Sequence, residues 1–178
     1  MRVIAGFKKG QILQAPKGDE IVRPTTDRVK EALFSILNFE LENSDVLDLF
    51  AGSGQLGIES LSRGAKHAFF IDCNQHSIKL VNQNLTACEF QTLATVIKSD
   101  FREFLKTNNQ KFDIIFIDPP YSINAWGEAL SLIDNSIKKR GIIALEHPTE
   151  CPIDDLEGYI RKDYKYGKII ITIFRKEA

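Results

Sequence analysis

The stretch DLFAGSGQLG, residues 48–57, decides the fold of this chain. It continues an apolar segment, residues 46–50, and it contains Gly52, Gly54 and Gly57 in the spacing G-x-G-x-x-G. A glycine turn between a strand and a helix lets the backbone approach an adenosine-containing ligand closely. Nicotinamide-dependent enzymes use the same device, so the turn predicts a fold and a ligand class but leaves the reaction open.

Outward from this turn, strands and helices alternate along the chain. Apolar runs predict further strands at residues 67–72, 93–98, 112–117 and 142–146. Apolar residues at helical spacing predict a helix between each pair of strands. The last of these helices is expected to end in the basic run at residues 138–141, and its apolar face comprises Trp126, Leu130, Ile133 and Ile137. This order is typical of a parallel sheet covered by helices on both faces.

The C-terminal end of the chain departs from this alternation. Residues 159–166 and 168–175 predict two strands joined by a tight turn at Gly167, which leaves no room for a crossover helix. The sheet is therefore expected to end in an antiparallel hairpin, which is unusual for a dinucleotide dehydrogenase. We predict an α/β, Rossmann-like domain at residues 45–178, built on a mostly parallel seven-stranded sheet.

A separate N-terminal extension is expected at residues 1–44. Residues 2–6 and 11–15 predict a small hairpin, and a helix is expected after Pro24, capped by Thr25 or Thr26. Residues 1–30 carry seven Lys and Arg against three Asp and Glu, whereas the rest of the chain carries sixteen against twenty-one. A basic arm on an acidic body indicates an anionic partner. The residues predicted to bind RNA or to act as a lid are Arg2, Lys8, Lys9, Arg23, Thr25 and Arg28.

Acidic residues follow the ends of the predicted parallel strands. Asp72 ends the second strand, 20 residues after Gly52, where a carboxylate can accept both ribose hydroxyls of an adenosine. Asp48 lies beside the glycine turn, where it would repel a pyrophosphate but attract the sulfonium and ammonium of S-adenosylmethionine. We therefore predict S-adenosylmethionine as the cofactor, with Phe101 covering the adenine. The predicted cofactor-binding residues are Asp48, Phe50, Gly52, Gly54, Asp72, Asp100 and Phe101.

The most specific motif is DPPY, residues 118–121, which directly follows the apolar strand at residues 112–117. Its chemistry suits methylation of an exocyclic amino group, whose lone pair is delocalised into the base. The Asp118 carboxylate and the Pro119 carbonyl can each accept one N–H and direct the nitrogen lone pair at the methyl group. The two prolines fix the backbone, and Tyr121 offers a face on which the base can stack. The predicted catalytic residues are Asp118, Pro119 and Tyr121.

The composition excludes several other classes of protein. The 178 residues are 43% hydrophobic and 26% charged, as in a globular domain, and no apolar run is long enough to cross a bilayer. The N-terminus lacks the apolar segment of a secretory signal, so we expect a cytoplasmic protein. The three cysteines and three histidines are scattered, so no metal site is expected. We expect a monomer.

At this level of detail the chain resembles the bacterial 16S rRNA (guanine-N2)-methyltransferase family, and the resemblance covers nearly its whole length. The motifs that carry it are RVIAG at residues 2–6, RPTTDRVKEALF at 23–34, the stretch at 48–57, SRGA at 62–65 and DPPY at 118–121. The resemblance implies the class I S-adenosylmethionine-dependent fold. It also implies transfer of a methyl group to N2 of a guanine in 16S rRNA, within a partly assembled small subunit. Gln55 departs from the small residue expected in the glycine turn.

Other functions remain open at this point. The same motifs fit an N6-adenine or other amino-methyltransferase acting on RNA or DNA, although a DNA enzyme usually adds a large sequence-reading segment. A non-catalytic RNA-binding module would not need Asp48, Asp72 and Asp118. A nicotinamide oxidoreductase explains neither Asp48 nor the terminal hairpin.

Overall fold

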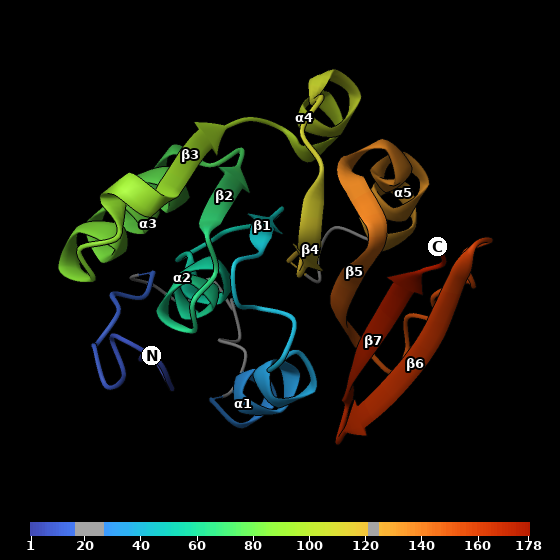
Figure 1. Cartoon of the computed structure of the whole chain (residues 1–178), viewed down its shortest axis with the longest axis horizontal. Helices are drawn as coiled ribbons and strands as arrows, with labels where there is room; N and C mark the ends of the chain where they lie inside the picture. Colours follow the sequence, from blue (N-terminus) through green and yellow to red (C-terminus); the bar gives the residue numbers. More distant parts are fainter. Residues whose placement is uncertain (17–26, 121–124) are drawn as a thin grey trace.

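The computed structural model describes residues 1–16, 27–120 and 125–178 (Figure 1). Within these ranges, seven strands form one sheet in the order β3-β2-β1-β4-β5-β7-β6. The strands are β1 (Asp45–Asp48), β2 (His67–Asp72), β3 (Ala94–Lys98), β4 (Phe112–Ile117), β5 (Ile137–Pro148), β6 (Tyr159–Tyr166) and β7 (Ile169–Lys176). The first five strands in this order, β3, β2, β1, β4 and β5, run parallel. Strand β7 pairs antiparallel with both β5 and β6. The predicted fold class and its terminal hairpin are confirmed.

Helices cover both faces of this sheet. The α-helices are α1 (Asp27–Ile36), α2 (Gln55–Ser62), α3 (Gln75–Ala87), α4 (Phe101–Thr107) and α5 (Trp126–Leu132), with 3-10 turns η1 (Gln91–Leu93) and η2 (Ile133–Ser136). Not one helix among the described residues is long and apolar enough to cross a membrane.

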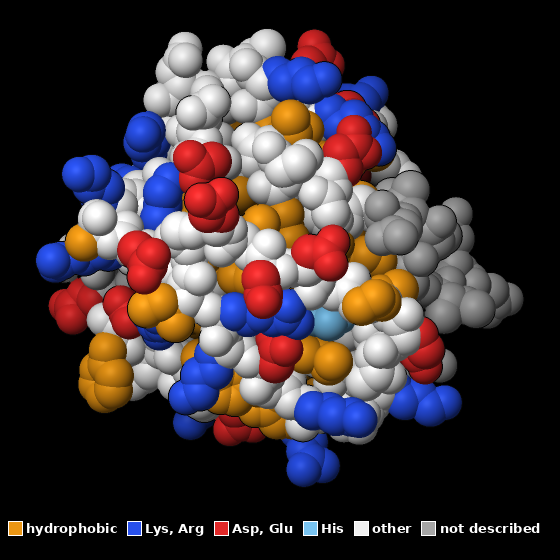
Figure 2. Space-filling view, turned by 90° about the vertical axis from the view of Figure 1, so that its right-hand side faces the viewer, with side chains coloured by type: hydrophobic (Ala, Val, Ile, Leu, Met, Phe, Trp, Pro, Cys, Tyr) orange, Lys and Arg blue, Asp and Glu red, His pale blue; other side chains and the backbone are white. Residues whose placement is uncertain are grey.

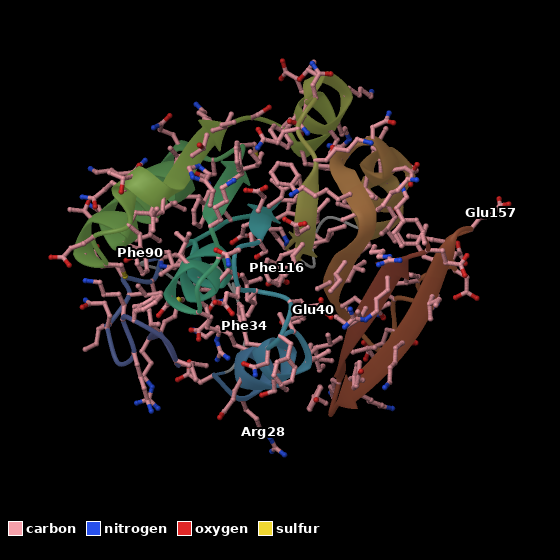
Figure 3. The ribbon with its side chains drawn as sticks, viewed as in Figure 1. Arg28, Phe34, Glu40, Phe90, Phe116 and Glu157 are labelled. Carbon is pink, nitrogen blue, oxygen red and sulfur yellow. The ribbon has the colours of Figure 1, made fainter. Side chains whose placement is uncertain are left out.

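The alternation of side chains along the central strands divides the core in two. Val46 and Phe116 face a core that also contains residues of α1, α2, α3 and the N-terminal segment. Leu47 and Ile117, one position along each strand, face a second core closed by α4 and α5. Figure 3 shows Phe34 of α1 lying against Phe116, with their ring centroids 5.7 Å apart. Because both faces are buried, the central strands are apolar at consecutive positions.

The helix predicted to reach residue 137 ends earlier. Helix α5 stops at Leu132, η2 follows, and Ile137 already pairs with Phe112 as the first residue of β5. The basic run after Ile137 forms an irregularity in the strand, because the register shifts before Ile142 pairs with Ile114. Lys138 is bound there by two carboxylates. The prediction was wrong because apolar residues of a helix, a 3-10 turn and a strand happened to repeat at one spacing.

The N-terminal hairpin is present and short. Arg2 and Ile12 form an antiparallel bridge, and the Val3 N–H donates to the Gln11 carbonyl at 2.9 Å. Val3 and Leu13 are buried in the core shared with α2, so the hairpin is packed on the domain rather than extended from it. Thr25 and Thr26, the predicted caps of α1, lie outside the described residues.

Packing against β2 leaves no space for a side chain at Gly57 of α2. A Cβ built there would lie 2.3 Å from the Phe70 ring. We expect Gly57→Ala to destabilise the fold by about 1–3 kcal/mol, because the buried ring must shift. Gly127→Ala in α5 is the control, since a Cβ there meets nothing within 4 Å and should stabilise the helix by about 1 kcal/mol. Denaturant unfolding measures both variants, and the clash is refuted if Gly57→Ala is as stable as the parent.

Candidate active site at the carboxyl edge of the sheet

The parallel register brings three of the predicted acidic residues to one edge of the sheet. Asp48 is the last residue of β1 and lies beside Phe70 of β2 and Phe116 of β4. Asp72 ends β2, and Asp118 directly follows β4. Strand β1 lies between β2 and β4, where the strand order switches direction. Open α/β sheets bind their ligands at the carboxyl edge beside such a switch point. The positions agree with the sequence analysis, and the roles of these residues remain predictions.

Asp72 holds the glycine turn against β2. One of its carboxylate oxygens accepts the Gly52 N–H at 2.9 Å, and the other accepts the Asn74 N–H at 2.8 Å. Gly52 and Gly54 have φ values of +54° and +79°, a conformation that side chains with a Cβ rarely adopt. Each carboxylate oxygen keeps a second lone pair, so Asp72 can still accept hydroxyl hydrogens from a ligand.

Asp48 is more deeply placed than the sequence indicated. Its side chain is 2% exposed, and its Oδ2 accepts the Gly57 N–H of α2 at 3.1 Å. The pKa of the Asp48 carboxyl is raised to about 7, mainly by burial; the Gly57 hydrogen bond opposes the rise, and the charge of Asp72 adds to it. A cationic ligand beside this carboxyl would stabilise its charged form.

An aromatic pair stands beside the turn. The rings of Phe50 and Phe101 lie with centroids 5.0 Å apart, and the Arg102 guanidinium sits 4.4 Å from the Phe101 centroid. Asp100 caps α4 through a 2.8 Å hydrogen bond from the Arg102 N–H. Phe101 is 6% exposed, so it belongs largely to the core, whereas Phe50 is only partly buried. The predicted adenine contact is thus more accessible at Phe50 than at Phe101.

Two further residues at this edge are buried, Pro119 and Gln55. Pro119 is buried directly after the partly exposed Asp118. Gln55, the first residue of α2, is 9% exposed, and within the described ranges its Oε1 is a buried oxygen with no hydrogen-bond partner. The described residues contain no group of three or more His, Cys, Asp or Glu arranged to hold a metal ion. Tyr121, Arg23 and Thr25, all predicted site residues, lie outside the described ranges.

The sequence analysis did not single out Glu146. It lies near the end of β5, next to β4, and it is 8% exposed. The sequence feature that could have indicated it is an acidic residue directly after the apolar run IIAL, near the end of a strand predicted in the same sheet.

Comparisons with known proteins place this geometry in a family. A family model described as Conserved hypothetical protein 95 matches residues 1–175. A Bacillus subtilis protein, YlbH, whose name proposes an rRNA methyltransferase, is 38% identical over 185 residues, covering 100% of both chains. The ribosomal RNA small subunit methyltransferase D of Haemophilus influenzae is 37% identical over 164 residues, covering 89% of this chain and 84% of the relative. The chain belongs to the small-subunit rRNA methyltransferase D family.

The solved structures agree. The structure of yhhF from Escherichia coli matches with a TM-score of 0.89 and 27% identity, covering 100% of this chain and 98% of the other. The match includes the N-terminal hairpin and the terminal strands, because it spans the whole chain.

In this member of the methyltransferase D family, a buried polar cluster fixes the N-terminal hairpin to α2. Glu59 accepts the N–H groups of Ile4 and Ala5 at 2.7 and 3.0 Å, and the Arg63 Nε–H at 2.8 Å. The Lys30 ammonium of α1, fully buried, lies 3.6 Å from Glu59 and donates to the Arg2 carbonyl at 2.6 Å. Burial lowers the pKa of Lys30, and the charge of Glu59 opposes this. The cluster thereby joins α1, α2 and the hairpin.

The residues predicted to contact RNA on the hairpin and α1 differ in how far they are exposed and in whether an acidic residue already pairs with them. Lys8 forms an ion pair with Glu89, so its charge is partly neutralised within the protein. Arg2 is largely exposed and lies 3.6 Å from Asp27. Lys9 is exposed, and Phe7 beside it is 82% exposed. Arg28 projects outward from α1 (Figure 3). Lys9, Phe7 and Arg28 are therefore better placed than Lys8 to meet a partner.

The buried Asp48 carboxyl makes the stability of the ligand-free protein depend on pH. Because its pKa rises from 3.8 to about 7 on folding, the folded state binds more protons between these values. Its contribution to stability therefore falls as pH rises from about 4 to 7. We expect Asp48→Asn, which lacks this ionisation, to gain about 2.5 kcal/mol relative to the parent between pH 5 and pH 8.

Urea unfolding of both proteins at the two pH values measures this difference. Subtraction cancels the titration of all groups that the two proteins share. Parallel stability curves would show that Asp48 is ionised at both pH values.

Proposed function

We propose that this protein transfers a methyl group from S-adenosylmethionine to the N2 amino group of a guanine in 16S ribosomal RNA, within a partly assembled small subunit. The observation that carries the proposal is the position of Asp118 and Pro119 at the same sheet edge as the glycine turn held by Asp72. The name of the Haemophilus influenzae relative supports the rRNA substrate.

The residues at the edge fit this cofactor. Asp72 offers lone pairs for the ribose hydroxyls, and the Phe50 and Phe101 rings offer an apolar side for the adenine. Asp48 and the Gln55 Oε1, which has no hydrogen-bond partner within the described ranges, are acceptors that suit a ligand with cationic and N–H groups. A ligand with a pyrophosphate would be repelled by the acidic groups of this edge. When bound, S-adenosylmethionine supplies an electrophilic methyl group.

The chain's own contribution to the reaction is to orient the amine. The Asp118 carboxylate and the Pro119 carbonyl accept its two hydrogens, which draws the nitrogen lone pair out of the ring and towards the methyl group. The carboxylate also stabilises the positive charge that develops on nitrogen. The methylated amine is then acidic enough to lose its proton without a strong base. Tyr121 is proposed to stack on the base.

The hairpin is proposed to supply the attraction for RNA. Residues 1–16 contain Arg2, Lys8 and Lys9 and no acidic residue, whereas the whole chain has a net charge of −1. The face that carries β6 and β7 mixes acidic and basic side chains (Figure 2), among them the pairs Arg161–Asp163 and Lys176–Asp134. An exposed aromatic ring among cations, as at Phe7, suits an unpaired base beside phosphates.

The decisive experiment incubates the protein with S-adenosylmethionine and either naked 16S rRNA or partly assembled subunits. Mass spectrometry of the digested RNA then identifies the methylated nucleoside. N2-methylguanosine at one site supports the proposal, and N6-methyladenosine would replace it with the adenine alternative.

Two aspartates should separate catalysis from cofactor binding. Asp118→Ala is expected to lower single-turnover methylation at least roughly 10²-fold, because the amine loses an acceptor, while cofactor affinity stays the same. Asp72→Ala is expected to weaken cofactor binding by roughly 1.5–3 kcal/mol, the value of a hydrogen bond to a charged group. Calorimetry measures binding, and rapid-quench assays at saturating cofactor measure turnover. Loss of cofactor binding in Asp118→Ala would contradict the assignment.

Lys9 tests the role of the hairpin. Lys9→Ala should reduce the dependence of RNA affinity on salt, lowering the slope of log K against log salt by about 0.7 to 0.9, because one fewer counterion is released. Lys139→Ala is the matched control, since Lys139 is also exposed but belongs to β5 and not to the hairpin. A salt series of RNA affinities measures both slopes. Equal slopes in the two variants would place the RNA away from the hairpin.

A further inference from the structure

Glu146 lies beside the proposed catalytic motif. Strands β4 and β5 run parallel, and Ile117 pairs with Leu145. Continuing this register by one residue places Asp118 opposite Glu146, on strands whose backbones lie about 4.8 Å apart. The carboxylate-bearing residues of the two strands therefore meet at the carboxyl edge.

Both residues belong to the same face of the sheet. Phe116 and Ala144, two positions earlier on each strand, are part of the core that packs against α1. Ile117 and Leu145 belong to the opposite core. Side chains alternate along a strand, so Asp118 and Glu146 follow Phe116 and Ala144 to the α1 face. This is also the face of Asp48, which follows Val46 in the same alternation.

Glu146 is buried, and its backbone is fixed in place. Glu146 is 8% exposed, follows the apolar run at residues 142–145, and pairs on its other side with Ile171, which is fully buried. The backbone at Glu146 is also fixed, because its carbonyl accepts the indole N–H of the buried Trp126 at 2.9 Å. A side chain on a rigid strand holds its position precisely, as a binding residue must.

We propose that the Glu146 carboxylate accepts the N1–H of the target guanine and so selects guanine over adenine. This role rests on the proposed function, in which Asp118 and Pro119 hold the N2 amine. Guanine presents N1–H directly beside that amine, so a second carboxylate next to Asp118 completes a row of acceptors for three adjacent hydrogens. Adenine presents a lone pair at N1, which a carboxylate repels.

The test uses a base that lacks the N1 hydrogen of guanine, together with its 6-oxo group. In 2-aminopurine the 2-amino group is kept, but N1 carries a lone pair in place of a hydrogen. The target nucleotide, once identified by mass spectrometry, is replaced by 2-aminopurine in a synthetic RNA segment ligated into the 16S rRNA. Single-turnover methylation is then compared for the two bases. The parent protein is expected to prefer guanine by at least about 10²-fold, since an unpaired buried acceptor opposes the analogue.

Glu146→Gln keeps the shape of the side chain but gives it an N–H donor that suits a lone pair at N1. We expect this variant to lose methylation of guanine by at least 10-fold and to reduce the preference over 2-aminopurine by at least 10-fold. Its cofactor affinity, measured by calorimetry, should equal that of the parent. Glu150→Gln is the matched control, because Glu150 is exposed four residues further along, and it should leave the preference unchanged.

The outcomes separate this role from the proposed function. A parent that makes no N2-methylguanosine refutes the proposed function and this role with it. A parent that methylates guanine while Glu146→Gln keeps the same preference refutes only the role of Glu146. Glu146→Ala provides a second variant: it should lose guanine activity and reduce the preference over 2-aminopurine, since it removes both the acceptor for N1–H and the charge that repels a lone pair.

Discussion

The hydrogen bond between the Gly52 N–H and the Asp72 carboxylate ties the glycine turn to the neighbouring strand, and the geometry of the edge follows from it. Gly52 and Gly54 turn the chain sharply after β1, so that α2 begins immediately over the sheet. Asp48 then accepts the Gly57 N–H within the first turn of that helix. Two carboxylates thus satisfy backbone donors that a helix start and a tight turn would otherwise leave unpaired. The same carboxylates are the candidate cofactor ligands, so the site is preorganised by the contacts that form the fold.

A second set of contacts links this edge to the N-terminal hairpin. Asn84 of α3 donates to the Ser53 carbonyl in the glycine turn and to the Gln14 carbonyl, and it accepts the Gln14 N–H. At the far side, Glu59 and buried Lys30 bind the backbone of residues 2–5. Removal of one member of a buried ion cluster leaves an uncompensated charge, which costs about 3–5 kcal/mol. The hairpin is therefore held on both sides, and an RNA bound to it would occupy a fixed position relative to the glycine turn.

How much of this could be read from the sequence depends on how local each feature is. The glycine turn, the aspartates at strand ends and the DPPY motif lie within short segments, and parallel strands must bring their ends together, so the sheet and its edge could be predicted. The end of α5 could not, because Ile137 is a strand residue only through its pairing with Phe112. Lys138 is bound by Asp45 and Asp113, each at 2.8 Å, although it is remote from Asp45 in the chain. The pairing of Lys8 with Glu89 is equally non-local. The position of Glu146 beside Asp118 likewise depends on the register between β4 and β5, which the sequence does not show.

On the proposed function, the protein must bind a cationic cofactor and also an RNA polyanion. The structure has separate regions for the two. Lys8 contacts Ser62 at the end of α2, whereas the acidic strand ends lie where α2 begins, so RNA phosphates and the cofactor would meet different electrostatic fields. Asp48 reduces the conflict further, because its pKa of about 7 leaves it partly protonated at neutral pH. A cationic ligand beside it would favour the charged carboxylate and cancel that charge at the same time. The edge then carries little additional negative charge in either state. An ordinary, fully ionised aspartate at this position would lack that property, which is why the burial of Asp48 matters as much as its charge.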